Sequence, residues 1–192
     1  KEKNVKHIHF NQSDYFPSVA TSISWYLIEN KPNEKKCIIN DNYELDLSSV
    51  IYIPQKPCKA SISIHQKVML LDNDKIDMQY DYVTCHNNIL LKSSRNNTHS
   101  SISKKKTNTH IYPVFHTNKQ VWYSEIKQDF LDKKKVLFTR SGYTKFIYDN
   151  GQQGVTDLGY YILVDSDEEG KILVNNLNSK LFTYILKSAK WS

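Results

Sequence analysis

Glycine is missing from most of this chain, because the first 141 of its 192 residues contain none. Proteins that bind nucleotides or dinucleotides cradle the phosphates in a glycine-containing loop after a strand, where the backbone must approach the ligand closely. Such a loop is therefore excluded from residues 1–141. Tight turns and close backbone packing are expected instead where the five glycines lie, at Gly142, Gly151, Gly154, Gly159 and Gly170.

Cysteine and long apolar runs are also scarce. The three cysteines, Cys37, Cys58 and Cys85, are odd in number and far apart, which predicts no disulfide framework and favours a reducing cytoplasm. No apolar run approaches the roughly 20 residues that cross a bilayer, so we expect no membrane partner. The chain begins with Lys1 and not with Met, which suggests a piece of a longer protein.

The seven histidines form no recognisable metal motif in the sequence. His7 and His9 are two apart and Cys85 precedes His86, but no second pair stands at the spacing of a zinc finger or a zinc ribbon. We therefore expect no metal site, and we interpret the histidines as surface or half-buried side chains.

The net charge of +6 suits a partner that carries phosphates, because each neutralised phosphate releases a counterion and adds affinity. The basic residues, however, are 24 lysines and only two arginines. An AT-rich coding sequence would produce the same bias without any selection for DNA binding. Charge alone leaves both interpretations open.

The N-terminal part predicts a strand, a hairpin and a boundary. Residues 19–28 are β-branched and aromatic, which favours a buried strand. The strand-like residues 37–39 and 43–45 flank residues 40–42, whose Asn and Asp side chains tolerate turn geometry. Pro54 and Pro57 predict an extended connector, and we place a boundary there between domains 1–55 and 56–192.

Beyond the boundary the sequence predicts one short helix, a loop and several strands. Residues 62–71 favour a helix, and the polar tract 93–108 favours a loop. Asp149-Asn150-Gly151 is a strong signal for a hairpin turn, because Asn and Gly accept positive φ. The expected strands are residues 111–115, 121–123, 136–139, 145–148 and 160–164.

A single amphipathic helix is expected over residues 166–189. Ser166 and Glu169 have the spacing of a capping box, with acids near the positive end of the helix dipole. Apolar residues recur every four positions, at Leu173, Leu177, Leu181 and Ile185. The full pattern predicts the α+β class, with a mixed, mostly antiparallel β-sheet, hairpins, and a C-terminal amphipathic helix packed on it.

No consistent catalytic set emerges from these residues. Asp165, Asp167, Glu169 and Lys171 could hold a divalent ion in a metal-dependent nuclease, but they lie in a single helical turn, where capping explains them more economically. The nuclease stays open as an alternative. A protein-interaction domain without DNA binding is a second alternative, in which the lysines reflect genomic bias.

Residues 133–156 offer side chains that suit duplex DNA. Arg, Lys and Gln can hydrogen-bond base edges in the major groove, and Ser, Thr and Lys bind phosphates well. A solvated polar hairpin is the competing interpretation. The candidate DNA contacts are Lys134, Lys135, Arg140, Ser141, Tyr143, Lys145, Gln152, Gln153 and Thr156.

Four segments follow one another in this region: KVLFTRSGY (135–143), GVTD (154–157), YYILV (160–164) and LNSKLF (177–182). In this order they resemble the C-terminal target-recognition region of restriction-modification adenine-specific (N6) DNA methyltransferases. The final residues 190–192 resemble the start of that family's Lys-Trp-Ser ending. More weakly, residues 21–30 resemble a strand late in the family's catalytic domain, and residues 51–54 resemble the crossing into the recognition region.

The resemblance implies a type II system in which this chain reads double-stranded DNA while a methyltransferase catalytic domain, in cis or in trans, flips and methylates the adenine. Residues 1–55 would be a remnant of that catalytic domain, and residues 56–192 the target-recognition domain. The family holds the target adenine in an Asn/Asp-Pro-Pro-aromatic loop, but this chain has no Pro-Pro pair. We therefore expect no catalytic residue and no cofactor here, because S-adenosylmethionine would bind the missing catalytic domain.

Overall fold

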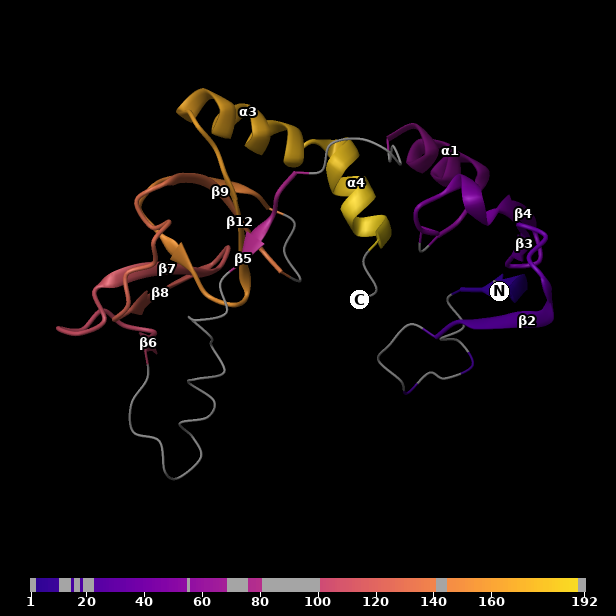
Figure 1. Cartoon of the computed structure of the whole chain (residues 1–192), viewed down its shortest axis with the longest axis horizontal. Coiled ribbons are helices and arrows are strands. Elements are labelled where there is room, and N and C mark those ends of the chain that lie inside the picture. The colour runs from indigo at the N-terminus through magenta and orange to yellow at the C-terminus, as the bar shows by residue number, and fades with distance from the viewer. Residues whose placement is uncertain are drawn as a thin grey trace. The chain divides into compact units, whose positions relative to one another are not determined.

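The computed structural model describes residues 3–10, 15, 18, 23–54, 56–68, 76–80, 101–140 and 145–189. The chain forms two compact units (Figure 1). The first unit comprises Lys1–Asp74 and Tyr184–Ser192, and the second comprises Lys75–Thr183. Within the described residues, no helix is long and apolar enough to cross a membrane.

The first unit is built on a four-stranded sheet with the order β2-β1-β3-β4. Strand β1 pairs antiparallel with β2 and parallel with β3, while β3 and β4 form an antiparallel hairpin. This hairpin confirms the prediction, and its turn residues Asn40 and Asp41 have the positive φ values of 49° and 58° that Asn and Asp tolerate. The strands are β1 (Lys3–His9), β2 (Trp25–Pro32), β3 (Lys36–Ile39) and β4 (Tyr43–Asp46).

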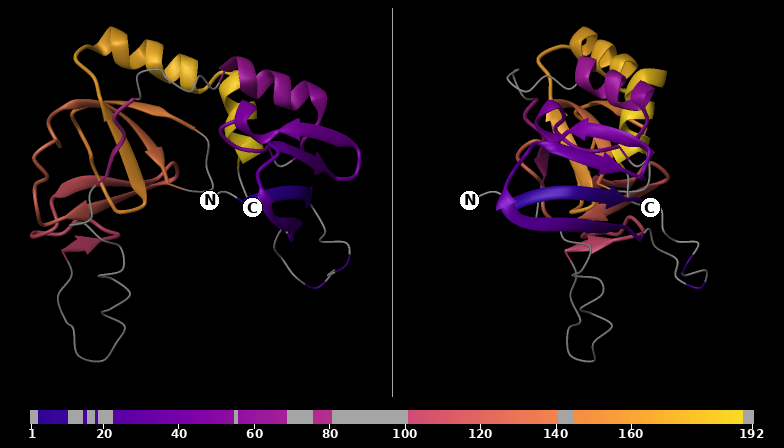
Figure 2. Two further views of the ribbon diagram at one scale, coloured as in Figure 1. Left: turned by 45° about the vertical axis from the view of Figure 1, so that its right-hand side comes forward. Right: turned by 90° about the vertical axis from the view of Figure 1, so that its right-hand side faces the viewer.

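Helix α1 (Lys59–Val68) completes the core of the first unit and confirms the short helix expected near residues 62–71. It lies along the β3–β4 hairpin (Figure 2) and follows a 3-10 turn, η2 (Leu47–Ser49). Ile62 of α1 is buried with Cys37, Ile39 and Leu45 of the hairpin. The first unit thus continues beyond residue 55, where the sequence suggested a boundary.

Strand β2 differs from the buried strand expected at residues 19–28. The strand begins at Trp25, and residues 19–22 lie outside the described residues. β2 lies at the edge of its sheet, so the side chains of Trp25, Tyr26, Leu27 and Ile28 are 46%, 66%, 49% and 48% exposed. Hydrophobicity predicts a strand, but pairing with distant segments decides whether that strand is central or at an edge.

The second unit contains two further four-stranded sheets, with the orders β10-β9-β12-β5 and β11-β7-β8-β6. All strand pairs are antiparallel except β11 with β7. The five predicted strands are confirmed, and the α+β class with mostly antiparallel sheets is correct. The strands are β5 (Gln79–Tyr80), β6 (Ile102–Ser103), β7 (Tyr112–Thr117), β8 (Gln120–Ser124), β9 (Lys134–Thr139), β10 (Ile147–Asn150), β11 (Gly154–Val155) and β12 (Gly159–Leu163).

The core of the second unit draws residues from both of its sheets. Phe115 and Val155 of one sheet are buried with Leu137 and Tyr161 of the other. The ring of Phe130 stacks on Tyr161 with 4.0 Å between the ring centroids. The polar tract 93–108 contributes the short strand β6, which differs from the loop expected there, and its residues 93–100 lie outside the described residues.

The predicted turn at Asp149-Asn150-Gly151 exists, but the hairpin prediction is wrong. Gly151 has a φ of 75°, as the turn signal required. However, β10 pairs with β9 and β11 pairs with β7, so the turn carries the chain from one sheet to the other. The turn signal reports only the local backbone, while strand pairing depends on the rest of the unit.

The single helix expected over 166–189 is two helices, α3 (Asp167–Leu177) and α4 (Lys180–Ala189). The Asn178 side chain causes the break, because it accepts the Phe146 N–H and donates to the Phe146 carbonyl, both at 2.9 Å. Ser179 then caps α4 by accepting the Phe182 N–H. α3 packs on β9 and β10 as predicted, but Leu181 in the expected apolar stripe is 50% exposed.

Candidate nucleic-acid interface

The predicted DNA contacts do not gather at one place, because they lie at opposite ends of β9. Lys134 begins this strand and Arg140 follows its last residue, so about 20 Å of extended backbone separates them. We call Arg140, Lys145, Asn118 and Lys119 the Arg140 end. Lys133, Lys134, Gln152 and Gln153 form the Lys134 end, since Asn150 at the end of β10 pairs with Lys134.

Three connections between strands meet at the Arg140 end. The Arg140 N–H donates to the Leu158 carbonyl at 2.7 Å, which joins the end of β9 to the β11–β12 turn. The Asn118 side chain donates to the Lys145 carbonyl at 3.0 Å, which joins the β7–β8 turn to the start of β10. These two hydrogen bonds hold the backbone of Arg140 and of Lys145, which fixes where their side chains begin.

The side chains at the Arg140 end are mostly cationic. Arg140, Lys119 and Lys145 are exposed, and neither Arg140 nor Lys145 forms an ion pair with another described residue. The β11–β12 turn adds one carboxylate, Asp157. The predicted contacts Ser141 and Tyr143 belong to the β9–β10 connection but lie outside the described residues.

Thr156 lies near this end but is fully buried, so it does not belong to the surface that the sequence suggested. Its hydroxyl lies 3.0 Å from Nδ1 of His116, whose ring stacks on Trp122 at 3.7 Å. Its carbonyl accepts the Gly159 N–H at 2.8 Å. Thr156 therefore shapes the β11–β12 turn that holds Arg140 in place.

Lys135 is the second predicted contact that is fully buried. Burial lowers the pKa of its ammonium, while the hydrogen bond with Asp149 acts in the opposite direction. Its Nζ lies 2.8 Å from Oδ2 of Asp149 and donates to the carbonyls of Phe130, Leu131 and Lys133 at 3.1, 2.9 and 2.7 Å. Because the hydrogen bonds of this ammonium are made inside the fold, Lys135 stabilises the second unit and does not reach DNA.

Lys134 is half-buried and joins helix α3 to the sheet. Its Nζ lies 2.7 Å from Oδ1 of Asp167, which also accepts a hydrogen bond from the Tyr148 hydroxyl at 3.0 Å. The hydrogen bond from Lys134 is the main reason that the pKa of Asp167 is lowered, and it raises the pKa of Lys134 in return. The pair neutralises charge at this end of β9.

The acids that a metal-dependent nuclease would need serve the start of α3. Ser166 Oγ accepts the Glu169 N–H at 3.1 Å, and Glu169 Oε2 accepts the Asp165 N–H at 2.8 Å. The expected N-cap is thus confirmed, with Glu169 bonding one residue before the cap. Because Asp167 is paired with Lys134, these carboxylates form caps and ion pairs and do not converge on one cation.

Gln152 and Gln153 follow the Asp149 turn at the Lys134 end. The Asp149 carboxylate accepts both backbone N–H groups, at 3.1 and 3.2 Å, which holds the loop in shape. The Gln152 side chain is exposed, whereas Oε1 of Gln153 is buried with no hydrogen-bond partner among the described residues. Only Gln152 of this pair is therefore open to a partner.

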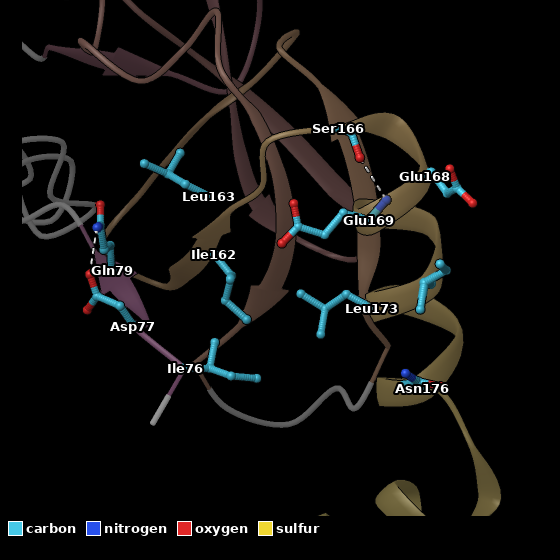
Figure 3. Close-up of a pocket in the computed structure, with 11 residues that line it drawn as sticks. Ile76, Asp77, Gln79, Ile162, Leu163, Ser166, Glu168, Glu169, Leu173 and Asn176 are labelled. Atoms are coloured by element: carbon cyan, nitrogen blue, oxygen red, sulfur yellow. Dashed lines mark hydrogen bonds between the residues drawn. The ribbon is translucent and has the colours of Figure 1, made fainter. Parts of the chain in front are cut away.

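A pocket that the sequence did not predict lies between α3, β12 and residues 76–79, with a volume of about 670 Å³. Ile76, Ile162 and Leu173 point toward one another in it, and the Glu169 carboxylate turns toward Ile162 while Glu168 points away (Figure 3). Acidic side chains at an apolar hollow repel phosphates, so this pocket does not suit a DNA backbone. Residues 76–79 contain no sequence pattern that predicts this pocket.

Two histidine clusters occur in the first unit. Nε2 of the buried His65 lies 2.8 Å from both the Tyr52 hydroxyl and Ser188 Oγ, and Nδ1 lies 2.6 Å from the Ser61 carbonyl. The Ser188 hydroxyl donates to the Ile185 carbonyl at 2.7 Å, so this network ties α1 to α4. Among the described residues, the group able to hold a metal is His7, His9 and Asp41.

Comparison of the chain with protein-family models, with curated proteins and with solved structures finds no match.

Proposed function

We propose that the chain is a sequence-specific double-stranded DNA recognition module of a type II restriction-modification adenine methyltransferase, and that it is not catalytic by itself. The Arg140 end of the second unit is its proposed contact surface. The observation that carries this proposal is the meeting of three turns there, where the exposed Arg140 and Lys145 stand at the two ends of the β9–β10 connection. The resemblance of residues 135–182 to the recognition regions of that family supports it.

The chemistry of the two cations suits a groove of duplex DNA. The planar guanidinium of Arg140 can donate two hydrogen bonds to O6 and N7 of guanine, which distinguishes base pairs. The ammonium of Lys145 suits a phosphate, which positions the protein without reading sequence. Both residues start from backbone held by hydrogen bonds, so little backbone entropy is lost on binding, and the ordering cost falls on the two side chains.

The Lys134 end is the less suitable surface, because Lys134, unlike Arg140 and Lys145, is already paired with a carboxylate. Lys134 is paired with Asp167, and Lys127 lies 2.5 Å from Asp132. A phosphate at this end would have to compete with these carboxylates. The exposed Gln152 could still donate to a base edge, which makes it a useful comparison.

Methyl transfer would come from a catalytic domain that binds S-adenosylmethionine, in cis or in trans. The exposed apolar edge strand β2 favours a protein partner for the first unit, because its edge can accept a further strand and its faces can be covered. We propose that this partner is the catalytic domain. The free cysteines Cys37 and Cys58 suit the reducing cytoplasm in which we place the protein.

The test is selection of bound sequences from random duplex DNA by the full chain, repeated with four alanine variants. We expect one sequence to be enriched, and R140A to lose discrimination at one base pair. K145A should weaken binding to all sequences alike, whereas K133A and Q152A, at the opposite end of β9, should leave the enriched sequence unchanged. Failure to enrich any sequence, or a loss in Q152A with R140A unaffected, would overturn the proposal.

A further inference from the structure

The first unit brings two histidines of one strand against a carboxylate from a distant turn. His7 and His9 are two residues apart in β1, so their side chains leave the same face of the strand. Asp41 belongs to the β3–β4 turn, 32 residues after His9. We propose that His7, His9 and Asp41 bind one divalent transition-metal ion, with zinc as the representative, independently of the DNA surface on the second unit.

The distances between the three ligand atoms suit one ion. Oδ1 of Asp41 lies 2.9 Å from Nε2 of His9 and 3.7 Å from Nδ1 of His7, and all three atoms lie within 4.8 Å of one another. Two ligand atoms bound to a tetrahedral zinc ion at about 2.0–2.1 Å lie roughly 3.3 Å apart. The two observed distances to Asp41 bracket this value, so small side-chain rotations complete the site.

The turn that carries Asp41 is held against β1 by its neighbour. The Asn40 N–H donates to the Ile8 carbonyl at 3.0 Å, and Oδ1 of Asn40 accepts the Phe10 N–H at 2.8 Å. These two bonds enclose His9 from both sides along the chain. Together with the positive φ of Asn40 and Asp41, they place the Asp41 carboxylate at the histidines before any ion binds.

The imidazole of His9 is also fixed in orientation. Its ring stacks on the indole of Trp25 with 4.0 Å between centroids and 10° between planes. A ligand whose ring is already oriented loses less freedom on binding an ion. The exposed Trp25 of the edge strand β2 thus has a specific role beside the site.

The donor set selects a class of cation. Two imidazole nitrogens and one carboxylate suit zinc, cobalt or nickel, whereas magnesium and calcium prefer oxygen ligands alone. His9 is nearly buried, but the side chains of His7 and Asp41 are 30% and 70% exposed. Water can therefore occupy the remaining position of a three-ligand site.

Metal binding by the full chain is the direct test. A zinc titration monitored by calorimetry should give one site per chain. Cobalt should give the visible absorption bands of a four-coordinate ion. D41N and H7Q should each weaken zinc binding by at least about tenfold, since each removes a metal ligand. Mutation of residues that merely support a ligand already weakens metal binding about 10- to 100-fold. H110Q, which changes a histidine outside the cluster, should bind zinc like the wild type.

Thermal unfolding with and without zinc checks that the variants are folded. Asn tolerates the positive φ at position 41, so D41N keeps the turn. At a zinc concentration near the wild-type Kd, zinc should raise the melting temperature of the wild type and of H110Q clearly more than that of D41N. Absence of cobalt bands, or equal zinc affinity in the wild type, D41N and H7Q, would leave only a His9–Asp41 hydrogen bond and overturn the proposal. Neither result bears on DNA selection by the second unit.

Discussion

The ammonium of Lys135 lies 2.8 Å from the carboxylate of Asp149, and both side chains are buried in the second unit. The two residues face each other across β9 and β10. Asp149 also accepts the backbone N–H groups of the loop that follows, so this single pair joins the strands and shapes the turn between the two sheets. A cation that resembled a DNA contact in the sequence is therefore part of the core.

Replacing Lys135 by methionine should lower the free energy of unfolding by about 3–5 kcal/mol, because Asp149 then stays buried without a counter-charge. Urea denaturation followed by tryptophan fluorescence measures this loss. The double variant K135M/D149N should lose less, since both charges are removed together while the amide oxygen of Asn can still accept from the loop N–H groups. K36A, which breaks an exposed pair with Glu44, should leave the free energy of unfolding almost unchanged. Equal losses in K135M and the double variant would contradict this account.

Acid should weaken the contact between α3 and the sheet. Hydrogen bonds from Lys134 and Tyr148 lower the pKa of Asp167 below its usual 3.8, so this carboxyl is harder to protonate in the folded state. Its stabilising contribution is present above the unfolded-state pKa and is lost as the pH falls through the folded-state pKa. The difference in free energy of unfolding between the wild type and D167N should therefore shrink below pH 3.8. If this difference between the wild type and D167N were the same at pH 7 and in strong acid, the carboxylate of Asp167 would not be the stabilising group.

Gly170 lets α3 approach β10 closely, and this predicts that the cost of a substitution at Gly170 depends on Tyr148. A Cβ at this position would lie 2.5 Å from the ring of Tyr148, so G170A should destabilise the protein despite the better helix propensity of alanine. In a Y148A background the same change should cost much less, because the Tyr148 ring is gone and the contact with Val164 Cγ2 at 3.2 Å remains to oppose the better helix propensity of alanine. Thermal denaturation of the four proteins measures both effects. Equal destabilisation by G170A in both backgrounds would rule out the Tyr148 contact as the cause.

Asn178 should be needed for the break between α3 and α4. N178A removes both hydrogen bonds to the Phe146 backbone and should cost about 1–3 kcal/mol, the penalty for leaving buried polar groups without partners. N178D keeps an acceptor for the Phe146 N–H and should lose less. Chemical denaturation compares the two, and an equal cost would show that the Phe146 N–H bond contributes nothing.

Binding to duplex DNA should depend on salt through Lys145. K145A should reduce the slope of log affinity against log salt by about one, because one phosphate contact is lost. R140A should cost about 1–3 kcal/mol on the selected sequence and relax the preference at one base pair. Fluorescence anisotropy at several salt concentrations measures both. K133A serves as the matched control, and a slope reduced equally by K133A would argue against the Arg140 end.

Local signals in the sequence predicted local structure well. The Asn40–Asp41 turn and the Ser166 cap form as expected, because each depends on residues within a few positions along the chain. The five expected strands of the second unit also form, since β-branched and aromatic runs bounded by turns need no distant partner to be recognised.

Long-range pairing could not be predicted in the same way. The sequence suggested that Lys135 and Thr156 face DNA, but their burial depends on Asp149 and His116, which lie on other strands. The helix over 166–189 breaks because Asn178 bonds Phe146, 32 residues earlier. Each burial and the helix break require contact between two distant segments. A pattern along one segment does not indicate which distant segment will contact it.

The sequence by itself determined the α+β class and the positions of most helices and strands. It also determined the positive net charge, which suits a partner that carries phosphates. The tertiary structure decided which cations remain on the surface, because burial is set by neighbours and not by residue type. It also decided that Asp41 lies beside His7 and His9, which spacing along the chain had given no reason to join. Propensity and turn chemistry act over a few residues, whereas a binding site is assembled by contacts between distant ones.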